Sequence, residues 1–420
     1  MVPPLGRQAW QLLGGIALFE VGTGMTLPLV IVYLHDSVGL SLSRAGVALA
    51  AMGAGGLAGV LIAGWAVDRW SALGTALVAL AAACIGSLAF LVVHDLPQAA
   101  LAAALQGGGF AALFIGVFPL LIRSVEPSRR SDVLGTNYAV TNLGLGLGAA
   151  LAGLLLTAHP SAFRPLFVVD ALSSAAFAVL LVAARTPPQP AAERGATHSG
   201  YAGVARDRRL LAVTGINLLL VVAGYSQTSS ALPAWVTGPG RLPSSVVGYA
   251  FAANTWTVAI AQLPAIALVR RGRRTRAVAL TGVLFAACWL VVLAAGVDPG
   301  GAVAAGLVIA GLVIFAFGEV VLSPSLPAIV NDLTGEASRG RYVALYSLSW
   351  QAGPMIGPPI GAAAVGAGQS RSLMLGLAAA CLLTVPAALA LERTLPVQVN
   401  RAECHRSAED EHAPDAEDPR

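Results

Sequence analysis

The chain has 420 residues, of which 56% are hydrophobic and only 11% are charged. An ordinary soluble domain carries about 25% charged residues, so a soluble fold of this composition would expose large apolar patches to water. The composition excludes a soluble globular protein and favours one embedded in lipid. The net charge of +4 arises from 25 arginines and no lysine, and these arginines separate apolar stretches. Nucleic acid is therefore not an expected partner.

Twelve apolar stretches follow one another along the chain, each about as long as a helix needs to cross a bilayer. The first is too long for the core of a signal peptide and no convincing cleavage site follows it, so we expect an uncleaved first helix. The expected spans are residues 10–34, 45–67, 72–93, 99–122, 133–157, 166–184, 210–232, 245–269, 277–296, 302–326, 342–366 and 372–391.

The placement of arginine predicts the orientation. With both termini in the cytoplasm, 21 of the 25 arginines are cytoplasmic, and the exceptions are Arg44, Arg164, Arg241 and Arg371. This matches the positive-inside rule for a multi-pass protein of the cell membrane. We expect a six-helix bundle at residues 1–184, a proline- and arginine-rich cytoplasmic linker at 185–209, a second six-helix bundle at 210–391 and a disordered acidic tail at 392–420.

Glu20 lies about ten residues into the first span, which places it about 15 Å deep, near the middle of a bilayer. A bare carboxylate at that depth costs about 2.5 kcal/mol or more, so it needs a function or a partner. One hypothesis is that Glu20 exchanges protons near neutral pH or pairs with a cationic substrate. The other is that it is a neutral, hydrogen-bonded structural residue. Thr23 follows on the same helix face.

Two further acids lie within apolar spans. Glu319 lies in the inner part of the tenth span, one turn before Pro324. It would either couple protons or act in a gate, or it would satisfy backbone groups that the proline frees. Asp170 lies one turn into the sixth span, near the outer surface, where we expect a structural residue of the membrane interface.

Uncharged polar residues recur at helical spacing in several spans. In lipid, such groups face either protein or a water-filled cavity, and aromatic residues among them could stack on a flat, lipophilic or cationic substrate. Helix–helix hydrogen bonding is the alternative for each one. The cavity candidates are Thr23, Gln106, Asn137, Thr141, Asn142, Asn217, Tyr225, Gln227, Asn254, Gln262, Tyr346 and Trp350.

The two halves of the chain look related. "RRSDVLGTNYAVTNLGLGLG" (129–148) aligns without gaps with "SRGRYVALYSLSWQAGPMIG" (338–357), at an offset of 209 residues. An internal repeat of half the chain length is typical of duplicated transporters. The alignment places Gly144 on Gly353 and Gly148 on Gly357. Glycines four residues apart share one helix face and let helix backbones pack closely.

The loop after the second span reads "GWAVDRWSALG" (64–74) and resembles the Gly-x-x-x-Asp-Arg-x-Gly-Arg-Arg loop of the major facilitator superfamily. Gly64, Asp68 and Arg69 match, whereas Ser71 replaces the second glycine and the trailing basic pair is absent. The resemblance implies that Asp68 and Arg69 take part in a gate; otherwise they merely end a helix. The remaining gate candidates, which could instead face lipid head groups, are Arg130, Arg339 and Arg341.

Residues 317–350, "FGEVVLSPSLPAIVNDLTGEASRGRYVALYSLSW", resemble the tenth and eleventh spans of a subgroup of that superfamily containing bacterial multidrug–proton antiporters. "LFVVDALSSAAFA" (166–178) resembles its sixth span. Gln106-Gly107 matches part of the antiporters' Arg-x-x-Gln-Gly, with Ala103 where the arginine would be. Over roughly residues 10–391, the resemblance implies an all-α integral membrane protein of twelve transmembrane helices in two pseudo-symmetric six-helix bundles around a central cavity.

The function that this resemblance implies is proton-coupled export of lipophilic or cationic small molecules by alternating access. The alternatives are an importer or facilitator of a small nutrient, and a non-transporting membrane sensor or scaffold. No Walker loop, Gly-x-Ser-x-Gly or His-Glu-x-x-His motif is present, so we expect neither ATP drive nor an enzyme. Cys404, His405 and His412 lack the spacing of a metal site, and no metal or cofactor is expected. The expected partners are the substrate, protons and lipid, and we expect a monomer.

Overall fold

The computed structural model describes residues 5–184, 206–297, 301–334 and 336–401, leaving aside the side chains of Ser131, Arg270, Arg271 and residues 336–340. Over this part of the chain the protein is helical without a strand, which confirms the predicted fold class. Eleven of the described helical stretches are long and apolar enough to cross a membrane. A twelfth long helix, α15 (Glu336–Gly366), contains three prolines and is less apolar.

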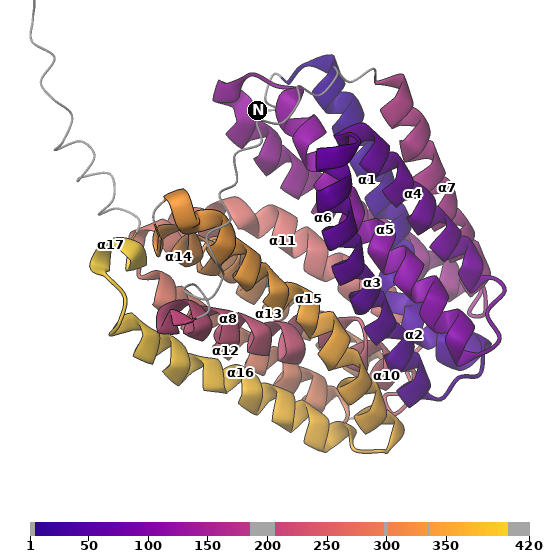
Figure 1. The fold of residues 1–420 in the computed structure, drawn as a ribbon. Helices are drawn as coiled ribbons and strands as arrows, with labels where there is room; N and C mark the ends of the chain where they lie inside the picture. The colour runs from indigo at the N-terminus through magenta and orange to yellow at the C-terminus, as the bar shows by residue number, and fades with distance from the viewer. Residues whose placement is uncertain (1–4, 185–205, 298–300, 335, 402–420) are drawn as a thin grey trace, which may run out of the picture.

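The first six spans pack together as one half of the molecule (Figure 1). In this half α1 packs against α6 and α7, and α5 packs against α3 and α4. The first span begins with α1 (Arg7–Thr26). The next five are single helices: α3 (Leu42–Arg69), α4 (Ala72–Phe90), α5 (Leu96–Arg123), α6 (Arg130–Ala158) and α7 (Phe163–Ala183). Their bounds agree with the predicted spans to within about one helical turn.

The last six spans form the second half, in which α12 packs against α13 and α16, and α8 packs against α15 and α16. Its long helices are α8 (Arg208–Leu220), α11 (Ser245–Arg271), α12 (Arg274–Ala295), α13 (Gly301–Leu322), α15 and α16 (Ser370–Glu392). Residues 208 and 209, which were assigned to the linker, are the first turn of α8. The remaining linker residues 185–205 lie outside the described part.

Short polar side chains start several helices by accepting hydrogen bonds from the first backbone N–H groups. Ser41 does this for α3, Asp95 for α5, and Ser71 for α4, where its Oγ accepts from the N–H of Gly74 at 2.9 Å. Ser71, which departs from the family loop, is therefore the N-cap of the third span. The predicted loop 64–74 is almost entirely helical, because α3 runs to Arg69.

Asp207 caps α8 and connects it to the start of α15. Its Oδ1 accepts from the N–H of Arg209 at 2.8 Å, and its Oδ2 accepts from the hydroxyl of Tyr342 at 2.7 Å. Partial burial raises the pKa of Asp207, but these hydrogen bonds and the charge of Arg209 outweigh it and hold the pKa below its ordinary value. The carboxylate is thus a stable junction between the seventh and eleventh spans.

Three spans are interrupted within the membrane. The first span continues beyond α1 through a 3₁₀ turn (η1, Leu27–Leu29), a short α2 (Val30–Val32) and a π-helical turn (η2, Tyr33–Ser37). The seventh continues through a π-helical turn (η5, Val221–Tyr225), α9 (Ser226–Thr228) and α10 (Ala231–Thr237), and the tenth through α14 (Leu326–Asp332). The first and seventh spans occupy equivalent places in the two halves, so this interruption follows the internal repeat.

Two pairs of helices join the halves, α3 with α15 and α6 with α11. A β-carbon placed at Gly46 of α3 would lie 2.7 Å from that of Ala362, and one at Gly53 would lie 2.9 Å from the backbone of Met355. One placed at Gly64, further along α3, would meet nothing within 4 Å. The α3–α15 contact therefore ends before the arginine-bearing end of α3.

The α6–α11 pair behaves in the same way. A β-carbon at Gly153 would lie 2.9 Å from the ring of Tyr249 and one at Gly146 would lie 2.3 Å from Trp256, whereas Gly135 faces open space. The halves thus meet at one end and separate toward the other, where α14, α17 and the start of α1 lie (Figure 1). The equivalence of the two joining pairs is what two pseudo-symmetric halves require.

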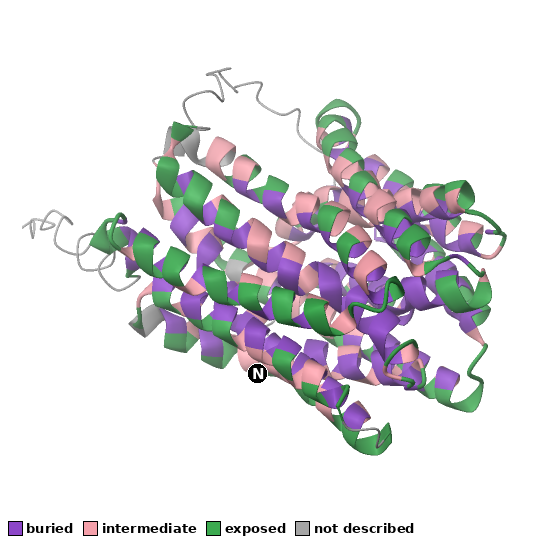
Figure 2. Ribbon diagram, turned by 90° about the horizontal axis from the view of Figure 1, so that it is seen from below, coloured by how far each residue is buried: buried purple, intermediate pink, exposed green. Residues whose placement is uncertain are grey.

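Burial follows the pattern expected in lipid. Exposed positions form stripes along the outer faces of the helices, and buried positions gather between them (Figure 2). Many exposed positions are large and apolar, such as Leu61, Val179 and Ile260. Where the structure describes the tail, it corrects the predicted disorder. A short helix, α17 (Val397–Asn400), packs against α14, with Val399 and Asn400 buried; residues 402–420 lie outside the described part.

Candidate functional site

Glu20 lies near the middle of the 31-residue span Arg7–Ser37 and is 1% exposed. It borders a cavity of about 20 Å³, enough for about one water molecule. Apart from Glu20 and Asn137 the cavity is apolar, and its lining is Ile16, Phe19, Leu113, Phe114, Val117, Phe118, Leu121 and Phe177. The carboxyl group is therefore held in a mainly aromatic and aliphatic environment inside the N-terminal half.

Both carboxyl oxygens of Glu20 are buried without a hydrogen-bond partner in the described part of the chain. The same holds for Oδ1 of Asn137 and Oγ1 of Thr141, both on α6, which packs against α1. A buried polar group without a partner costs about 1–3 kcal/mol, and a lone charge costs more. The four unpartnered oxygens lie on the two facing helices and make this region the strongest candidate for a polar ligand.

Asp170 lies on α7 and is 3% exposed, in contrast to the expected place at the membrane interface. Its Oδ2 accepts three hydrogen bonds, from Ser87 Oγ at 2.6 Å, Gln106 Nε2 at 2.8 Å and Thr26 Oγ1 at 3.2 Å. The expectation failed because α7 begins at Phe163, which places Asp170 two turns deep. The three donors come from α5, α4 and α1, so the carboxylate joins four helices.

Glu319 lies on α13 and accepts a hydrogen bond from Asn254 Nδ2 on α11, at 2.7 Å. The same amide also donates to the carbonyl of Leu312 at 3.2 Å. The span continues to Asp332 through α14, so Glu319 is closer to the middle of the tenth span than the sequence indicated. Gln262 Nε2 contacts Ser323 Oγ at 3.4 Å on the same pair of spans, α11 and the tenth.

Four of the predicted cavity residues form a connected group in the C-terminal half. Asn217 donates to Ser349 Oγ at 2.7 Å and accepts from the hydroxyl of Tyr346 at 3.1 Å, which in turn accepts from the indole of Trp350 at 3.2 Å. The ring of Tyr225 lies 4.9 Å from that of Trp350, edge to face. The sequence placed these residues on two separate spans, and the structure brings them together.

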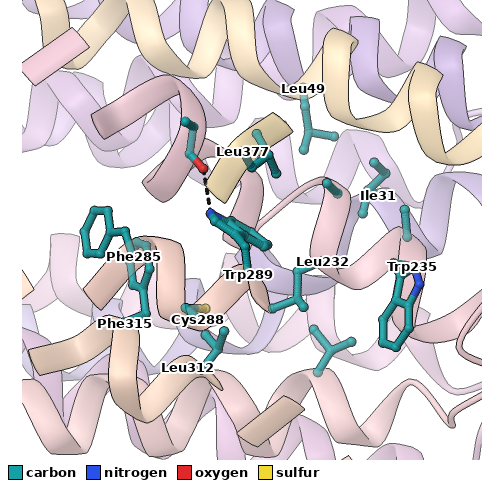
Figure 3. Packing of buried hydrophobic residues seen from close by; sticks show 14 of the residues in the cluster. Ile31, Leu49, Leu232, Trp235, Phe285, Cys288, Trp289, Leu312, Phe315 and Leu377 are labelled. Atoms are coloured by element: carbon teal, nitrogen blue, oxygen red, sulfur yellow. Dashed lines mark hydrogen bonds between the residues drawn. The ribbon is translucent and has the colours of Figure 1, made fainter. Parts of the chain in front are cut away.

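Tyr225 also packs against a group of buried aromatic rings in the C-terminal half. The rings of Phe285 and Phe315 stack with their centroids 3.8 Å apart, and Tyr225 contacts both edge to face. Trp289 donates to the carbonyl of Ala223 at 2.9 Å and so satisfies a backbone group of the π-helical turn η5 (Figure 3). The turn that carries Tyr225 is therefore held by packing and by a buried hydrogen bond.

The remaining cavity candidates bond to the protein itself. Gln227 is fully buried and donates to the carbonyls of Val222 and Gly357. Thr23 donates to the carbonyl of Phe19, and Asn142 to that of Tyr138. In this conformation the side chains of Gln227, Thr23 and Asn142 therefore donate to backbone carbonyls of the helices.

The gate candidates lie where the halves are apart. Asp68, Arg69 and Arg130 are exposed, and Asp68 makes no ion pair in the part of the chain that the structure describes. Arg341 is half-buried, whereas the side chain of Arg339 lies outside the description.

Sequence reasoning missed Thr26 and Ser87 as partners of Asp170. Their signal was weak, because single hydroxyls in apolar spans are common.

Two halves of six helices, joined by equivalent helix pairs and carrying interrupted spans, define the fold of an alternating-access membrane transporter. A family model described as Major Facilitator Superfamily matches residues 12–241 and 216–414. The chain belongs to this superfamily.

Curated relatives agree with this assignment. The chain is 22% identical over 386 residues to the uncharacterized MFS-type transporter YttB of Bacillus subtilis (strain 168), covering 91% of this chain and 94% of that one. It is 23% identical over 407 residues to the uncharacterized MFS-type transporter YqjV of the same organism, covering 95% and 96%.

Solved structures with the same fold include transporters of different solutes. An auto inhibited POT family peptide transporter matches with a TM-score of 0.74 and 16% identity, covering 93% of this chain and 98% of that one. The nucleoside transporter NupG matches with a TM-score of 0.72 and 13% identity, covering 92% and 99%. At these identities the likeness establishes the fold. The family model and the curated relatives make the protein a membrane transporter of the superfamily type.

Proposed function

We propose that the protein exports lipophilic or cationic small molecules in exchange for protons. The observation that carries this proposal is Glu20, a carboxyl group buried at mid-membrane with neither oxygen bonded, beside a phenylalanine-rich cavity. In this state a lone charge would be costly, so the group holds a proton. A cation that reached it could take the place of that proton.

Competition for one carboxyl group is sufficient to couple the two fluxes. Glu20 can neutralise its charge with a proton or with a cationic substrate, but not with both. Aromatic rings such as Phe19 and Phe177 would add cation–π and apolar contact for a lipophilic cation. The proton gradient then biases the cycle, because each protonation state favours a different conformation.

The orientation follows from the arginines. Under the positive-inside rule, the end at which the halves separate, where Arg69, Arg130 and Arg271 lie, is cytoplasmic. The described conformation would then be open to the cytoplasm and ready to accept substrate from it. Closure of that end would bring Asp68 and the arginines of the other helix ends together as a gate.

The test is a susceptibility panel of lipophilic cations and drugs in a host that lacks its own efflux pumps. We expect the intact protein to raise resistance to at least one compound and Glu20→Gln to abolish it at equal membrane abundance. Asp36→Asn is the matched control, because Asp36 is an exposed acid of the same span. Equal resistance with Glu20→Gln would overturn the role of Glu20.

A second measurement separates export from import. Purified protein in vesicles with an imposed pH gradient should move a compound from the panel against the proton flux. Uptake of one defined nutrient with the proton flux, and no effect on resistance, would instead establish an importer.

A further inference from the structure

A second cavity lies at the arginine-bearing end of the C-terminal half, far along the chain from Glu20. Its volume is about 420 Å³, and it opens between the end of α11 and the start of α12, with Val321 of α13 also lining it. Its lining is Leu268, Val269, Gly272, Arg273, Arg276, Ala277, Leu280, Val321 and Arg401. The cavity is large enough for a small polar group, and it combines basic with apolar side chains.

The charges around this cavity favour an anion. Arg273 and Arg276 both form ion pairs with Glu392, the second at 3.5 Å, and Arg401 adds a third positive charge. Three arginines against one carboxylate leave two positive charges in excess. The dipole of α12, whose positive end lies at Arg274, adds to the positive potential.

The site is held rigid by the tail. Arg274 is buried and bonds to Asp332 and to the carbonyl of Val399, at 2.5 and 2.8 Å. Asn400 accepts from the N–H of Thr275 at 3.0 Å and donates to its hydroxyl at 3.1 Å. These contacts fix α17 beside α12 and place Arg401 at the rim. The described part of the tail, up to Arg401, therefore completes a basic pocket.

The apolar wall indicates which anion fits. Leu268 and Leu280 line the cavity and are 66% and 44% exposed on the lipid-facing side of the helices. A phosphate with an attached acyl chain fits both the arginines and the leucines of this cavity. Arginine binds phosphate strongly, and basic pockets between membrane helices bind anionic head groups. We propose that this cavity binds the phosphate head group of an anionic phospholipid, with an acyl chain along Leu268 and Leu280.

The test measures binding of phosphatidylglycerol and phosphatidylcholine to the purified full-length protein by native mass spectrometry. We expect preferential binding of phosphatidylglycerol, and we expect Arg276→Gln combined with Arg401→Gln to weaken it by about tenfold or more. The matched control removes two exposed arginines at the same end of the other half, Arg7→Gln with Arg123→Gln. It should bind phosphatidylglycerol like the wild-type protein.

A second variant keeps every arginine and fills the space. Gly272→Phe places a ring at a lining position with no atom nearer than 3.8 Å to its β-carbon, and it should reduce phosphatidylglycerol binding as much as the arginine changes do. Equal binding of both lipids, or loss in the control alone, would overturn the proposal. Competition by millimolar inorganic phosphate as effective as that by the lipid would identify a free-anion site and overturn the lipid assignment.

Discussion

Two buried acids in the N-terminal half differ in whether their carboxyl groups accept hydrogen bonds. Asp170 receives three hydrogen bonds from three other helices, whereas both oxygens of Glu20 have no partner in the described structure. Donors that converge on a carboxylate stabilise it and hold the helices together. An unpartnered carboxyl is free to bind something else. The contrast assigns packing to Asp170 and supports exchange chemistry at Glu20.

This difference predicts the effect of substitutions at Asp170. Asp170→Ala would leave the buried hydroxyl of Ser87 without its acceptor, at about 1–3 kcal/mol, and would remove the shorter of the two hydrogen bonds that Gln106 donates. The unfolding temperature in detergent should therefore fall markedly. Asp170→Asn keeps one acceptor oxygen in place and should cost much less. The measurement is thermal unfolding of the purified variants. Equal losses for both variants would contradict the hydrogen-bond explanation.

At the scale of helices, glycine decides how closely the spans approach. A β-carbon at Gly148 of α6 would lie 2.0 Å from the carbonyl oxygen of Val21 on α1, and one at Gly357 of α15 would lie 2.4 Å from Ser226. The fifth span thus packs on the first, and the eleventh on the seventh, through the glycines that the internal alignment pairs. The close packing predicted from their spacing is confirmed.

A pair of alanine substitutions on α6 tests this packing. Gly148→Ala forces α1 and α6 apart, because the obstacle is backbone that no rotamer change can move, and it should sharply lower the yield of folded protein. Gly135→Ala lies on the same helix with open space around it, and it should be neutral or stabilise by up to about 1 kcal/mol. Size-exclusion profiles measure the yield of folded protein for the two variants, and thermal unfolding measures their stability. Similar behaviour of the two variants would refute the packing role.

The sequence predicted the spans well because apolar length is a strong local signal, and it singled out Glu20 as a candidate because a charge in such a span is conspicuous. It did not predict the partners of Asp170, since these depend on which helices meet. The interrupted spans were also missed, because apolar length persists through η1 and η5 while the hydrogen-bond pattern changes. The order of Val399 and Asn400 arises from contacts with α12 and α14, which no local pattern reveals.

At the scale of the molecule, the two joining helix pairs, α3 with α15 and α6 with α11, form the main contact between the halves. Their contacts lie toward the end that the positive-inside rule places outside, and the opposite ends are apart. Small residues at the contact, such as Gly46 and Gly153, bring the helices of the two halves close together. In the proposed transport cycle, alternating access would take the form of a rocking motion that transfers contact from one end of α3 and α15 to the other.

The register of α3 against α15 makes this motion testable by disulfide trapping. A β-carbon at Gly366 would lie 3.3 Å from that of Leu42, so Leu42→Cys with Gly366→Cys should cross-link readily in the described conformation, in a background without Cys84, Cys288, Cys381 and Cys404. Contacts that advance along α3 recede equally along α15, and the helical repeat of 3.6 residues puts Gly64 and Ala344 on the facing sides, where the helices have separated.

Gly64→Cys with Ala344→Cys should therefore cross-link only when the protein adopts the opposite conformation. We expect the first pair to lock the protein and stop transport in vesicles until a reductant is added. The second pair should gain cross-linking under conditions that favour the outward-open state, while the first loses it. The controls are the four variants with one cysteine each, which show whether the individual cysteines differ in reactivity. Simultaneous, condition-independent cross-linking of both pairs would show that α3 and α15 do not rock against each other.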